Sequence, residues 1–464
     1  MIKYRAAMPF FVDKGGGAYY NGVNIHPCAA AQNRRSDMAT IQLNTERIVK
    51  AMKPMHGGGQ PPVVSSARNT YFHYLTEAGI PYSRLHDVGG SFGGGKYVDI
   101  PNIFRNFDAD ENDPASYDFD FTDELLKHLV EADVEPYFRL GITIENAVKV
   151  KPYFVFPPKD YDKWARICEH IIRHYTEGWA NGFCYKITSW EIWNEPDNGQ
   201  MWNGTPEEYY RLYHVAATHL KKCFPHLKVG GYASCGFYAI ANGGNPWSTK
   251  PPEADMYWVN YFHGFMKYIK EHGSPIDFFS WHSYAPTKNV VKMDAWLHEQ
   301  LVAYGYGDLP THLNEWDPYA GELGTGHHAA EIAAMMIAMQ HGHVDLCCIY
   351  DMRISDAPYC PLFNPITCKP IHGYYAMVAF NTLYQLGSQA ETVCDTDELY
   401  ALAASDGRRH AMMVSNLTGA WQELHIEGAD LTGARYHVID NERLLSWAPN
   451  AKWIAPNSVV LIEW

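Results

Sequence analysis

The feature that most constrains this chain is a regular alternation of short apolar runs with longer amphipathic stretches through its middle. Such alternation is typical of a parallel β-sheet whose strands are connected by helices. Candidate strands lie at residues 22–25, 82–86, 135–140, 187–193, 228–232, 277–284, 310–315 and 344–350. Helix-like stretches between them include residues 121–132, 161–175, 206–224, 255–272 and 328–342. Eight strands connected in this way predict an α/β fold of the (β/α)₈ (TIM) barrel type.

The pattern changes after about residue 373, where a helix-like run is followed by segments with the period of two that marks β-strands. At 464 residues the chain is also longer than a typical single domain. We therefore expect a catalytic barrel over residues 12–375 and a smaller all-β, sandwich-like domain over residues 376–464. A strand within residues 1–11 is expected to join the second domain. The glycine runs at residues 57–59 and 89–95 are interpreted as loops, because no helix N-terminus follows the second one to bind a phosphate.

Charge and composition exclude several classes of partner. The chain has 37 Lys and Arg against 52 Asp and Glu, a formal net charge of −15, and it has no basic run. Nucleic acids and anionic membranes are therefore not expected partners. No stretch approaches the roughly 20 apolar residues of a membrane span, and a chain that begins at Met1 without a signal sequence is expected to be cytoplasmic. The ten cysteines are scattered without a CxxC pair, so reduced thiols are expected. The sequence leaves homo-oligomerisation open.

Two apolar segments each end in a glutamate. The first runs Ser-Trp-Glu-Ile-Trp-Asn-Glu up to Glu195 and is stopped by a proline, and the second runs His-Leu-Asn-Glu up to Glu315. Because the carboxyl ends of barrel strands face the active site, both glutamates are expected at the same mouth. Two facing carboxyl groups can supply the acid and the nucleophile of glycosidic cleavage, and a retaining enzyme holds them about 5–5.5 Å apart.

The segment Glu-Ile-Trp-Asn-Glu-Pro-Asp at residues 191–197 resembles the acid/base motif of the large superfamily of retaining barrel glycosidases. More narrowly, the chain resembles glycoside hydrolase family 39, which contains β-xylosidases and α-L-iduronidases. The resemblance spans roughly residues 82–373. It is carried by Tyr-Ser-Arg-Leu-His at 82–86, Tyr-Asp-Phe-Asp-Phe at 117–121, Glu-Pro-Tyr-Phe at 135–138, Asp-Phe-Phe-Ser-Trp-His-Ser-Tyr at 277–284, Asn-Glu-Trp at 314–316 and Ile-His-Gly at 371–373.

This resemblance implies that Glu195 is the acid/base, that Glu315 is the nucleophile and that Asn194 holds the 2-hydroxyl of the sugar. A raised pKa is expected for Glu195, because Glu315 is a neighbouring negative charge. No metal ion and no cofactor are expected. The remaining residues expected to bind substrate are His86, His282, Tyr284, Trp193 and Trp316. His282 and Tyr284 lie two apart on one strand and should point to the same face.

The resemblance favours an exo-acting β-xylosidase-like enzyme that acts on plant-type oligosaccharides. Two departures from the xylosidase pattern leave the sugar open: Asn314 stands where a threonine is more common, and residues 351–371, with Arg353 and Phe363, differ. An arabinosidase, a galactosidase and a uronic-acid hydrolase are therefore alternatives.

Two other classes of protein are alternatives to a glycosidase. Metal-dependent barrel hydrolases usually carry His-x-His on the first strand, whereas this chain has Asn-Ile-His-Pro at 24–27. Its paired histidines at 327–328 and 341–343 lie in or beside a helical stretch. A non-catalytic carbohydrate-binding protein would not require both Glu195 and Glu315, because binding alone does not use an acid and a nucleophile.

Overall fold

The computed structural model describes residues 37–63, 71–86, 98–142, 155–241, 252–318, 322–450 and 452–464. All of these residues belong to one compact unit. Within it, eight parallel strands form a closed barrel and nine further strands form a second sheet. The predicted fold class, a (β/α)₈ barrel with a smaller all-β part, is confirmed.

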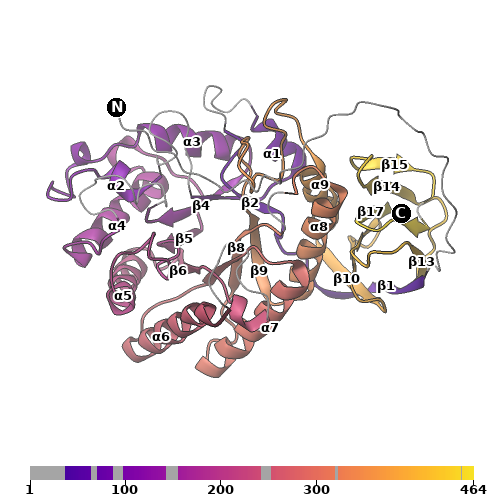
Figure 1. The fold of residues 1–464 in the computed structure, drawn as a ribbon. Coiled ribbons are helices and arrows are strands. Elements are labelled where there is room, and N and C mark those ends of the chain that lie inside the picture. Colours follow the sequence, from indigo (N-terminus) through magenta and orange to yellow (C-terminus); the bar gives the residue numbers. More distant parts are fainter. Residues whose placement is uncertain are drawn as a thin grey trace, which may run out of the picture. The chain divides into compact units, whose positions relative to one another are not determined.

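The barrel closes because its first strand pairs in parallel with its last as well as with its second. Helices lie outside the barrel strands, as in Figure 1. In chain order the barrel strands are β2 (Gly57–Gly59), β3 (Tyr82–Leu85), β4 (Glu135–Leu140), β5 (Ser189–Ile192), β6 (Lys228–Ser234), β7 (Phe279–Ser283), β8 (Thr311–Trp316) and β9 (Val344–Ile349). Seven of the eight predicted strands overlap one of these.

Three of the longer helices, which begin at Tyr161, Pro206 and Gly326, follow a residue whose side chain accepts a backbone N–H of the first turn, whereas those that begin at Met256 and Thr287 have no such side-chain cap. In α5 the Thr205 hydroxyl accepts the backbone N–H of Glu208 while the Glu208 carboxylate accepts the N–H of Thr205, which satisfies two donors at the helix start. The α-helices are α1 (His73–Ala78), α2 (Ile100–Ile103), α3 (Asp120–Glu131), α4 (Tyr161–Glu177), α5 (Pro206–Cys223), α6 (Met256–His272), α7 (Thr287–Tyr304), α8 (Gly326–His341) and α9 (His372–Tyr384). Short 3₁₀ turns are η1 (Pro114–Ser116), η3 (Trp179–Asn181), η4 (Tyr238–Ala241) and η5 (Pro252–Asp255).

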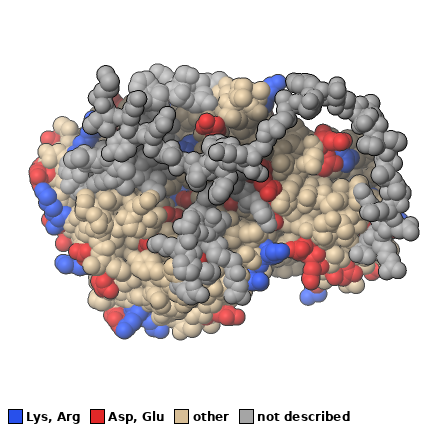
Figure 2. Space-filling model, viewed as in Figure 1, with Lys and Arg blue, Asp and Glu red and all other residues tan. Residues whose placement is uncertain are grey.

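Charged side chains of both signs are dispersed over the surface. On the face seen in Figure 2, the basic side chains stand singly or in small groups among acidic ones. Within the described part of the chain, no helix is both long enough and apolar enough to span a bilayer.

The first barrel strand differs from the prediction. Residues 22–25, predicted as that strand, lie outside the described residues, and the position is taken by Gly57–Gly59, a run for which the sequence predicts a loop. A side chain does not fit here: a Cβ on Gly57 would lie 2.7 Å from the Cys347 carbonyl oxygen, and one on Gly58 would lie 2.4 Å from Met352 Sδ. Close approach of neighbouring atoms therefore explains a strand built from residues that seldom form one.

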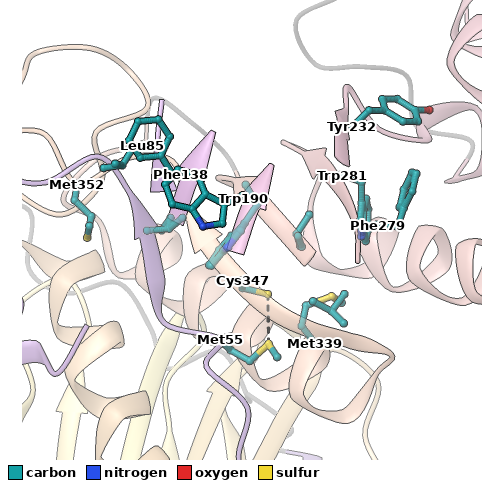
Figure 3. Close-up of a cluster of buried hydrophobic side chains, with 14 of the residues drawn as sticks. Met55, Leu85, Phe138, Trp190, Tyr232, Phe279, Trp281, Met339, Cys347 and Met352 are labelled. Carbon is teal, nitrogen blue, oxygen red and sulfur yellow. Dashed lines mark hydrogen bonds between the residues drawn. The ribbon is translucent and has the colours of Figure 1, made fainter. Parts of the chain in front are cut away.

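The barrel strands bury apolar side chains against the surrounding helices. Phe138 on β4 and Trp190 on β5 stack with ring centroids 5.0 Å apart, and Leu85 on β3 lies beside them in Figure 3. On the opposite strand β9, the Cys347 thiol lies 3.4 Å from Met55 Sδ. These contacts hold the barrel wall in place, so the ends of its strands provide a rigid support for a site.

The second sheet curls so that its distant strands share one core. Its order is β15-β14-β17-β12-β11-β10-β1-β13-β16, yet one apolar cluster takes residues from every one of these strands. The strands are β1 (Asp37–Ala51), β10 (Ser388–Cys394), β11 (Leu399–Ser405), β12 (His410–Asn416), β13 (Gln422–Glu427), β14 (Arg435–Ile439), β15 (Ser446–Ala448), β16 (Trp453–Ile454) and β17 (Ser458–Glu463).

The sheet and the barrel share a second apolar core, in which α8 and α9 contact β11 and β12. The predicted domain boundary between residues 375 and 376 falls inside α9, and β10 begins at Ser388. The division of the chain into domains at 375 stays a prediction. The strand expected within residues 1–11 lies outside the described residues, whereas β1, at residues 37–51, joins the sheet between β10 and β13.

Candidate active site

The barrel interior is layered, because every second residue of a strand points inward. On β3 the inward side chains are Tyr82, Arg84 and, just past the strand, His86. The lowest layer is apolar, and Tyr82 packs there against Tyr137 and Phe278. Polar groups occupy the levels above it, toward the carboxyl ends of the strands.

A buried arginine organises the polar layer. Arg84 Nε and Nη2 lie 2.9 and 2.7 Å from Glu191 Oε2, and Nη1 donates to Glu315 Oε2 at 3.2 Å. Nη2 also donates to Asn194 Oδ1 at 2.5 Å. The other carboxylate oxygen of Glu191 accepts the Asn314 amide at 2.6 Å. Burial alone would lower the pKa of Arg84, but the two carboxylates outweigh it and raise that pKa above its usual range. The guanidinium is therefore a permanent cation beneath the site.

A β-bulge brings Glu315 into the site. Trp281 pairs with Leu313, but the next residue, His282, pairs with Glu315, so Asn314 is an extra residue on β8. An extra residue interrupts the alternation of side chains between the two faces of a strand. As a result both Asn314 and Glu315 point into the barrel, where Asn314 donates to Glu191 and Glu315 accepts from Arg84.

Glu195 is placed by an unusual backbone after β5. Trp193 has φ 73° and Glu195 has φ 46°. These values lie in the left-handed region, which residues other than glycine seldom adopt. The backbone is held there because the Trp193 N–H donates to the Leu140 carbonyl and the Glu195 N–H donates to the Ala233 carbonyl. The Glu195 side chain then reaches His282, whose Nδ1 lies 2.8 Å from Glu195 Oε1.

Glu195, His282 and Glu315 meet at the mouth of the barrel. One carboxylate oxygen of each glutamate and a ring nitrogen of His282 all lie within 4.8 Å of one another. His282 Nδ1 is 3.7 Å from Glu315 Oε2. The Tyr284 hydroxyl donates to Glu315 Oε1 at 2.5 Å, so the side chains of His282 and Tyr284 both reach Glu315. His86 Nε2 lies 4.0 Å from Glu315 Oε2.

The two carboxyl groups have pKa shifts of opposite sign. Burial favours the protonated form of Glu195, but the hydrogen bond and charge of His282 outweigh it and lower the pKa of Glu195. For Glu315, burial and then the charge of Glu195 prevail over His282, Arg84 and Tyr284, and the pKa is raised. Burial opposes charging of His282, yet the two carboxylates raise its pKa. The expectation that the charge of Glu315 raises the pKa of Glu195 is therefore wrong for this site without substrate, because His282 lies between them.

Two further groups have pKa shifts that fix their protonation. Burial raises the pKa of Tyr284 well above its ordinary value, and the charge of Glu315 adds to this, so the phenol remains a hydrogen-bond donor. Burial, together with Arg139 and Arg84, lowers the pKa of His86 well below its ordinary value, so this ring is neutral.

A cavity of about 540 Å³ opens beside the pair of glutamates. Glu195, Glu315 and Tyr284 line it, together with Asp197. Asp197 is buried, and its carboxyl group accepts the Ser234 hydroxyl at 2.9 Å and the Cys235 N–H at 3.2 Å. Burial and then the negative charge of Glu195 raise the pKa of Asp197 to about 7.

The expectation that both tryptophans converge on this cavity is not met. Trp193 is 1% exposed, its indole N–H donates to the Met201 carbonyl at 2.9 Å, and its ring packs edge-on against Trp202. The left-handed turn directs this ring toward α4, where Trp164 lies 6.0 Å away, and away from the barrel mouth. Trp316 is fully buried and is not among the described residues that line the cavity. A substrate-binding role for Trp316 stays a prediction.

Sequence reasoning missed three polar residues that the structure places at or beneath the site: Arg84, Glu191 and Asp197. Each stands in a segment that was already singled out, but only for its resemblance to a family. The available signal was a charged residue in an otherwise apolar strand, because buried charges need partners. Arg84 in β3 and Glu191 in β5 fit that signal and pair with each other.

Among the described residues, two groups bring three metal-ligand atoms within 4.8 Å of one another. One is Glu195 with His282 and Glu315. The other is Glu169 with His219 and Cys223, between α4 and α5. In each group a carboxylate is already paired with an arginine, Glu315 with Arg84 and Glu169 with Arg173.

The comparisons with known proteins agree with this geometry. Residues 71–383 match the model of glycosyl hydrolases family 39. The chain is 27% identical over 219 residues to a β-xylosidase of Geobacillus stearothermophilus, covering 45% of this chain and 39% of the relative. It is 28% identical over 273 residues to a β-xylosidase of Caldicellulosiruptor saccharolyticus, covering 52% of this chain and 48% of the relative. The chain thus matches less than half the length of these curated relatives.

A solved structure extends the likeness over most of the fold. The crystal structure of a glucosidase from Croceicoccus marinus superposes with a TM-score of 0.71 at 20% identity, covering 92% of this chain and 99% of that one. At this identity the likeness concerns the fold alone. The family model, which spans well over half of the chain, decides membership. The chain belongs to glycosyl hydrolases family 39.

Proposed function

We propose that the protein is a retaining glycoside hydrolase that cleaves glycosidic bonds by double displacement, with Glu315 as nucleophile and Glu195 as acid/base. The observation that carries the proposal is the meeting of these two carboxyl groups, from β5 and β8, within 4.8 Å at the barrel mouth. This separation favours the retaining spacing of about 5–5.5 Å over the roughly 6.5–9.5 Å that leaves room for a water in inverting enzymes.

The hydrogen bonds of Glu315 suit a nucleophile. Arg84 donates to one carboxylate oxygen and Tyr284 to the other. Both donors fix the orientation of the carboxylate, and both stabilise its charged form. In the first step this carboxylate attacks the anomeric carbon, and the covalent bond to the sugar removes its negative charge.

The surroundings of Glu195 suit a group that gains and loses a proton. His282, whose pKa is raised, lies 2.8 Å away and holds a proton between the two carboxylates. In this proposal the proton passes from His282 Nδ1 to Glu195 as the glycosidic oxygen approaches, and Glu195 donates it to the leaving group. Glu195 then accepts a proton from the water that attacks the glycosyl-enzyme.

Asn194 is proposed to bind the 2-hydroxyl of the sugar. Its Oδ1 accepts from Arg84, which orients the amide and leaves the Nδ2 group as the donor toward a hydroxyl. Arg84 thus contacts both the nucleophile and this amide. A neutral His86, 4.0 Å from Glu315, is proposed to bind a neighbouring hydroxyl of the same sugar.

The proposed substrate is a neutral oligosaccharide from which the enzyme removes a terminal β-xylose. Support comes from the two relatives named as β-xylosidases, at 27% and 28% identity. An arabinosidase, a galactosidase and a uronic-acid hydrolase remain alternatives within the family. A carbohydrate-binding protein is the alternative outside catalysis. Oxygens of Glu195 and Glu315 that lie this close favour an enzyme, since binding needs no such pair.

A screen of nitrophenyl glycosides with the purified chain tests the activity and the sugar together. Hydrolysis that is lost in Glu195→Gln separates an enzyme from a binding protein, because the amide has nearly the same shape but no acidic proton. Absence of hydrolysis on every glycoside would refute the proposal.

Azide distinguishes the two roles. In Glu195→Ala, activated aryl glycosides still form the glycosyl-enzyme, and azide should restore turnover and give a glycosyl azide of retained configuration, since it needs no general base. In Glu315→Ala, azide should attack directly and give the inverted product. The same product from both variants, identified by NMR, would contradict the assignment.

A further inference from the structure

The described residues that line the cavity beside the glutamates lie mostly on one side of the barrel. Its inner end is formed by Glu195, Glu315 and Tyr284. Apart from Tyr359, the remaining described wall residues lie within 197–199, 235–238 and 254–258. The first two segments follow β5 and β6, and the third leads into α6. Arg84, which contacts Glu315 and Asn194, comes from β3 on the other side of β5 in the barrel.

The side of the barrel on which these wall residues lie indicates which part of the substrate would bind there in the proposed reaction. Glu195 protonates the oxygen that leaves with the second half of the substrate, so that half lies on the Glu195 side of the cleaved bond. We propose that this cavity is the subsite for the leaving group, and that it binds a neutral sugar ring against Tyr257 and Trp258. This inference rests on the proposed function and adds the part of the substrate that departs.

The aromatic residues suit such a ring. Tyr257 and Trp258 are consecutive near the start of α6; Tyr257 is 50% exposed and Trp258 is partly buried. Trp258 packs edge-on against Tyr238, with ring centroids 6.1 Å apart. The hydroxyl of Tyr238 accepts the backbone N–H of Tyr284 at 3.0 Å. The aromatic wall is thereby joined to the residue that holds the nucleophile, and its rings offer flat apolar faces with polar edges.

The charge of the wall limits the kind of sugar. Asp197 and Asp255 are buried in it, and carboxyl groups accept hydrogen bonds from sugar hydroxyls. No lysine or arginine is found among the described residues that line the cavity. Among the described wall residues an anionic sugar would meet Glu195 and these two carboxyl groups and no lysine or arginine to pair with. The volume, about 540 Å³, lies within the usual range of sites for small molecules.

The test compares two substrates that differ only in the leaving group. One is a disaccharide such as xylobiose, and the other is the glycosyl fluoride of the same sugar and anomer, which has no second ring. Tyr257→Ala and Trp258→Ala should each lower kcat/KM for the disaccharide about tenfold, as for a buried aromatic contact in an interface. The same variants should change kcat/KM for the fluoride less than twofold. Trp447→Ala, at a 65% exposed tryptophan on β15, is the control and should change neither.

Each other outcome has a defined meaning. Equal losses on both substrates would show that the rings support the catalytic residues and not the leaving group, and would overturn the inference. So would unchanged kcat/KM on both. If the wild-type chain hydrolysed neither substrate, nor any other glycoside, the proposed function itself would fail, which the fluoride result distinguishes from a failure of the subsite.

The limit on charge is tested with the wild-type chain. Two disaccharides are compared that differ only in the leaving sugar, which is neutral in one and a uronic acid in the other. The neutral one should be cleaved with a kcat/KM at least about tenfold higher, because each unpaired charge costs more than the roughly 1.4 kcal/mol of a tenfold change. Equal rates, or a preference for the acid, would refute the assignment of the acidic wall.

Discussion

Asp197 is a carboxyl group whose ionisation opposes folding. It is 3% exposed and lies two residues after Glu195, and it accepts hydrogen bonds from the Ser234 hydroxyl and the Cys235 N–H. Burial and the charge of Glu195 raise its pKa from 3.8 to about 7. Replacing Asp197 with asparagine keeps the shape and one accepting oxygen but removes the charge.

The size of the effect follows from that pKa. Below pH 4 Asp197 is protonated in both the folded and the unfolded chain. Between pH 4 and 7 the folded chain holds the proton while the unfolded chain has lost it, so the free energy of unfolding falls as the pH rises. The full difference corresponds to about 4 kcal/mol, reached above pH 7.

Asp197→Asn does not incur this loss. The variant and the wild-type chain should unfold at similar temperatures near pH 4. As the pH rises, the free energy of unfolding of the variant should increase relative to that of the wild type. At pH 8 a gain of about 4 kcal/mol corresponds to a thermal midpoint roughly 4 °C higher for a chain of this length. Differential scanning calorimetry at pH 4.5, 6 and 8, at one scan rate, measures this.

Asp406→Asn is the matched control. Asp406 is exposed, and the backbone N–H and side chain of Arg409 lower its pKa to about 2. Its contribution is present above pH 4 and is lost only as the pH falls toward 2, so this variant should gain nothing at pH 8. An Asp197→Asn midpoint that is lower than wild type at pH 8, or a difference that is independent of pH, would refute the reasoning.

Two further substitutions test the barrel itself. Arg84→Met leaves Glu191 buried beside an apolar side chain, and should lower the free energy of unfolding by about 3–5 kcal/mol in urea titrations; a loss below about 1 kcal/mol would contradict a stabilising role of the Arg84–Glu191 pair. Gly58→Ala places a Cβ 2.4 Å from Met352 Sδ and should cost about 1–3 kcal/mol. Gly199→Ala, where nothing lies within 4 Å of the added Cβ, should cost no stability, and equal losses at both glycines would contradict crowding by Met352 as the cause.

Much of the barrel could be predicted from the sequence because its strands are buried on both faces. Such strands appear as continuous apolar runs, and β4 begins and ends at the predicted residues, Glu135 and Leu140. The strand Gly57–Gly59 could not be found this way. Its identity depends on Cys347 and Met352, which lie about 290 residues further along the chain.

The long strand β1 was missed for a different reason. It alternates buried and exposed residues only as far as Leu43, and its pairing with β10 shifts register between Asn44 and Ile48. Its partners β10 and β13 lie more than 330 residues away in the sequence. No local pattern reports on pairing at that distance.

The positions of the two carboxyl groups could be predicted from the sequence, but the directions of the side chains next to them could not. Alternation along a strand places Glu195 at the end of β5, but it also predicts that the side chains just before Glu195 continue to alternate between the two faces of the strand. The left-handed backbone at Trp193 and Glu195 interrupts this alternation. Asn194 and Glu195 both reach the site, while the Trp193 ring turns outward to Trp202 and packs in the core.

The protonation of the site also depends on a residue from a third strand. Two carboxyl groups considered alone would raise each other's pKa, and the sequence predicts no more than this. In the structure His282 lies 2.8 Å from one and 3.7 Å from the other. His282 outweighs burial at Glu195 and lowers the pKa of that carboxyl, whereas at Glu315 burial and the charge of Glu195 outweigh His282 and raise the pKa.

Arg84 offsets the repulsion between the carboxyl groups that are buried together at the site. Three carboxyl groups, those of Glu191, Glu195 and Glu315, lie at or just beneath the barrel mouth, and the Arg84 guanidinium and the His282 ring lie among them. Arg84 alone spans β3, β5 and β8 through its bonds to Glu191 and Glu315. Because the same guanidinium also holds the Asn194 amide, any movement of the proposed nucleophile would move the group proposed to bind the 2-hydroxyl with it. Arg84→Lys, with a single point charge in place of the fork, should therefore lower kcat of the proposed hydrolysis even where the fold survives, because a lysine cannot bond Glu315 and Asn194 in the same geometry.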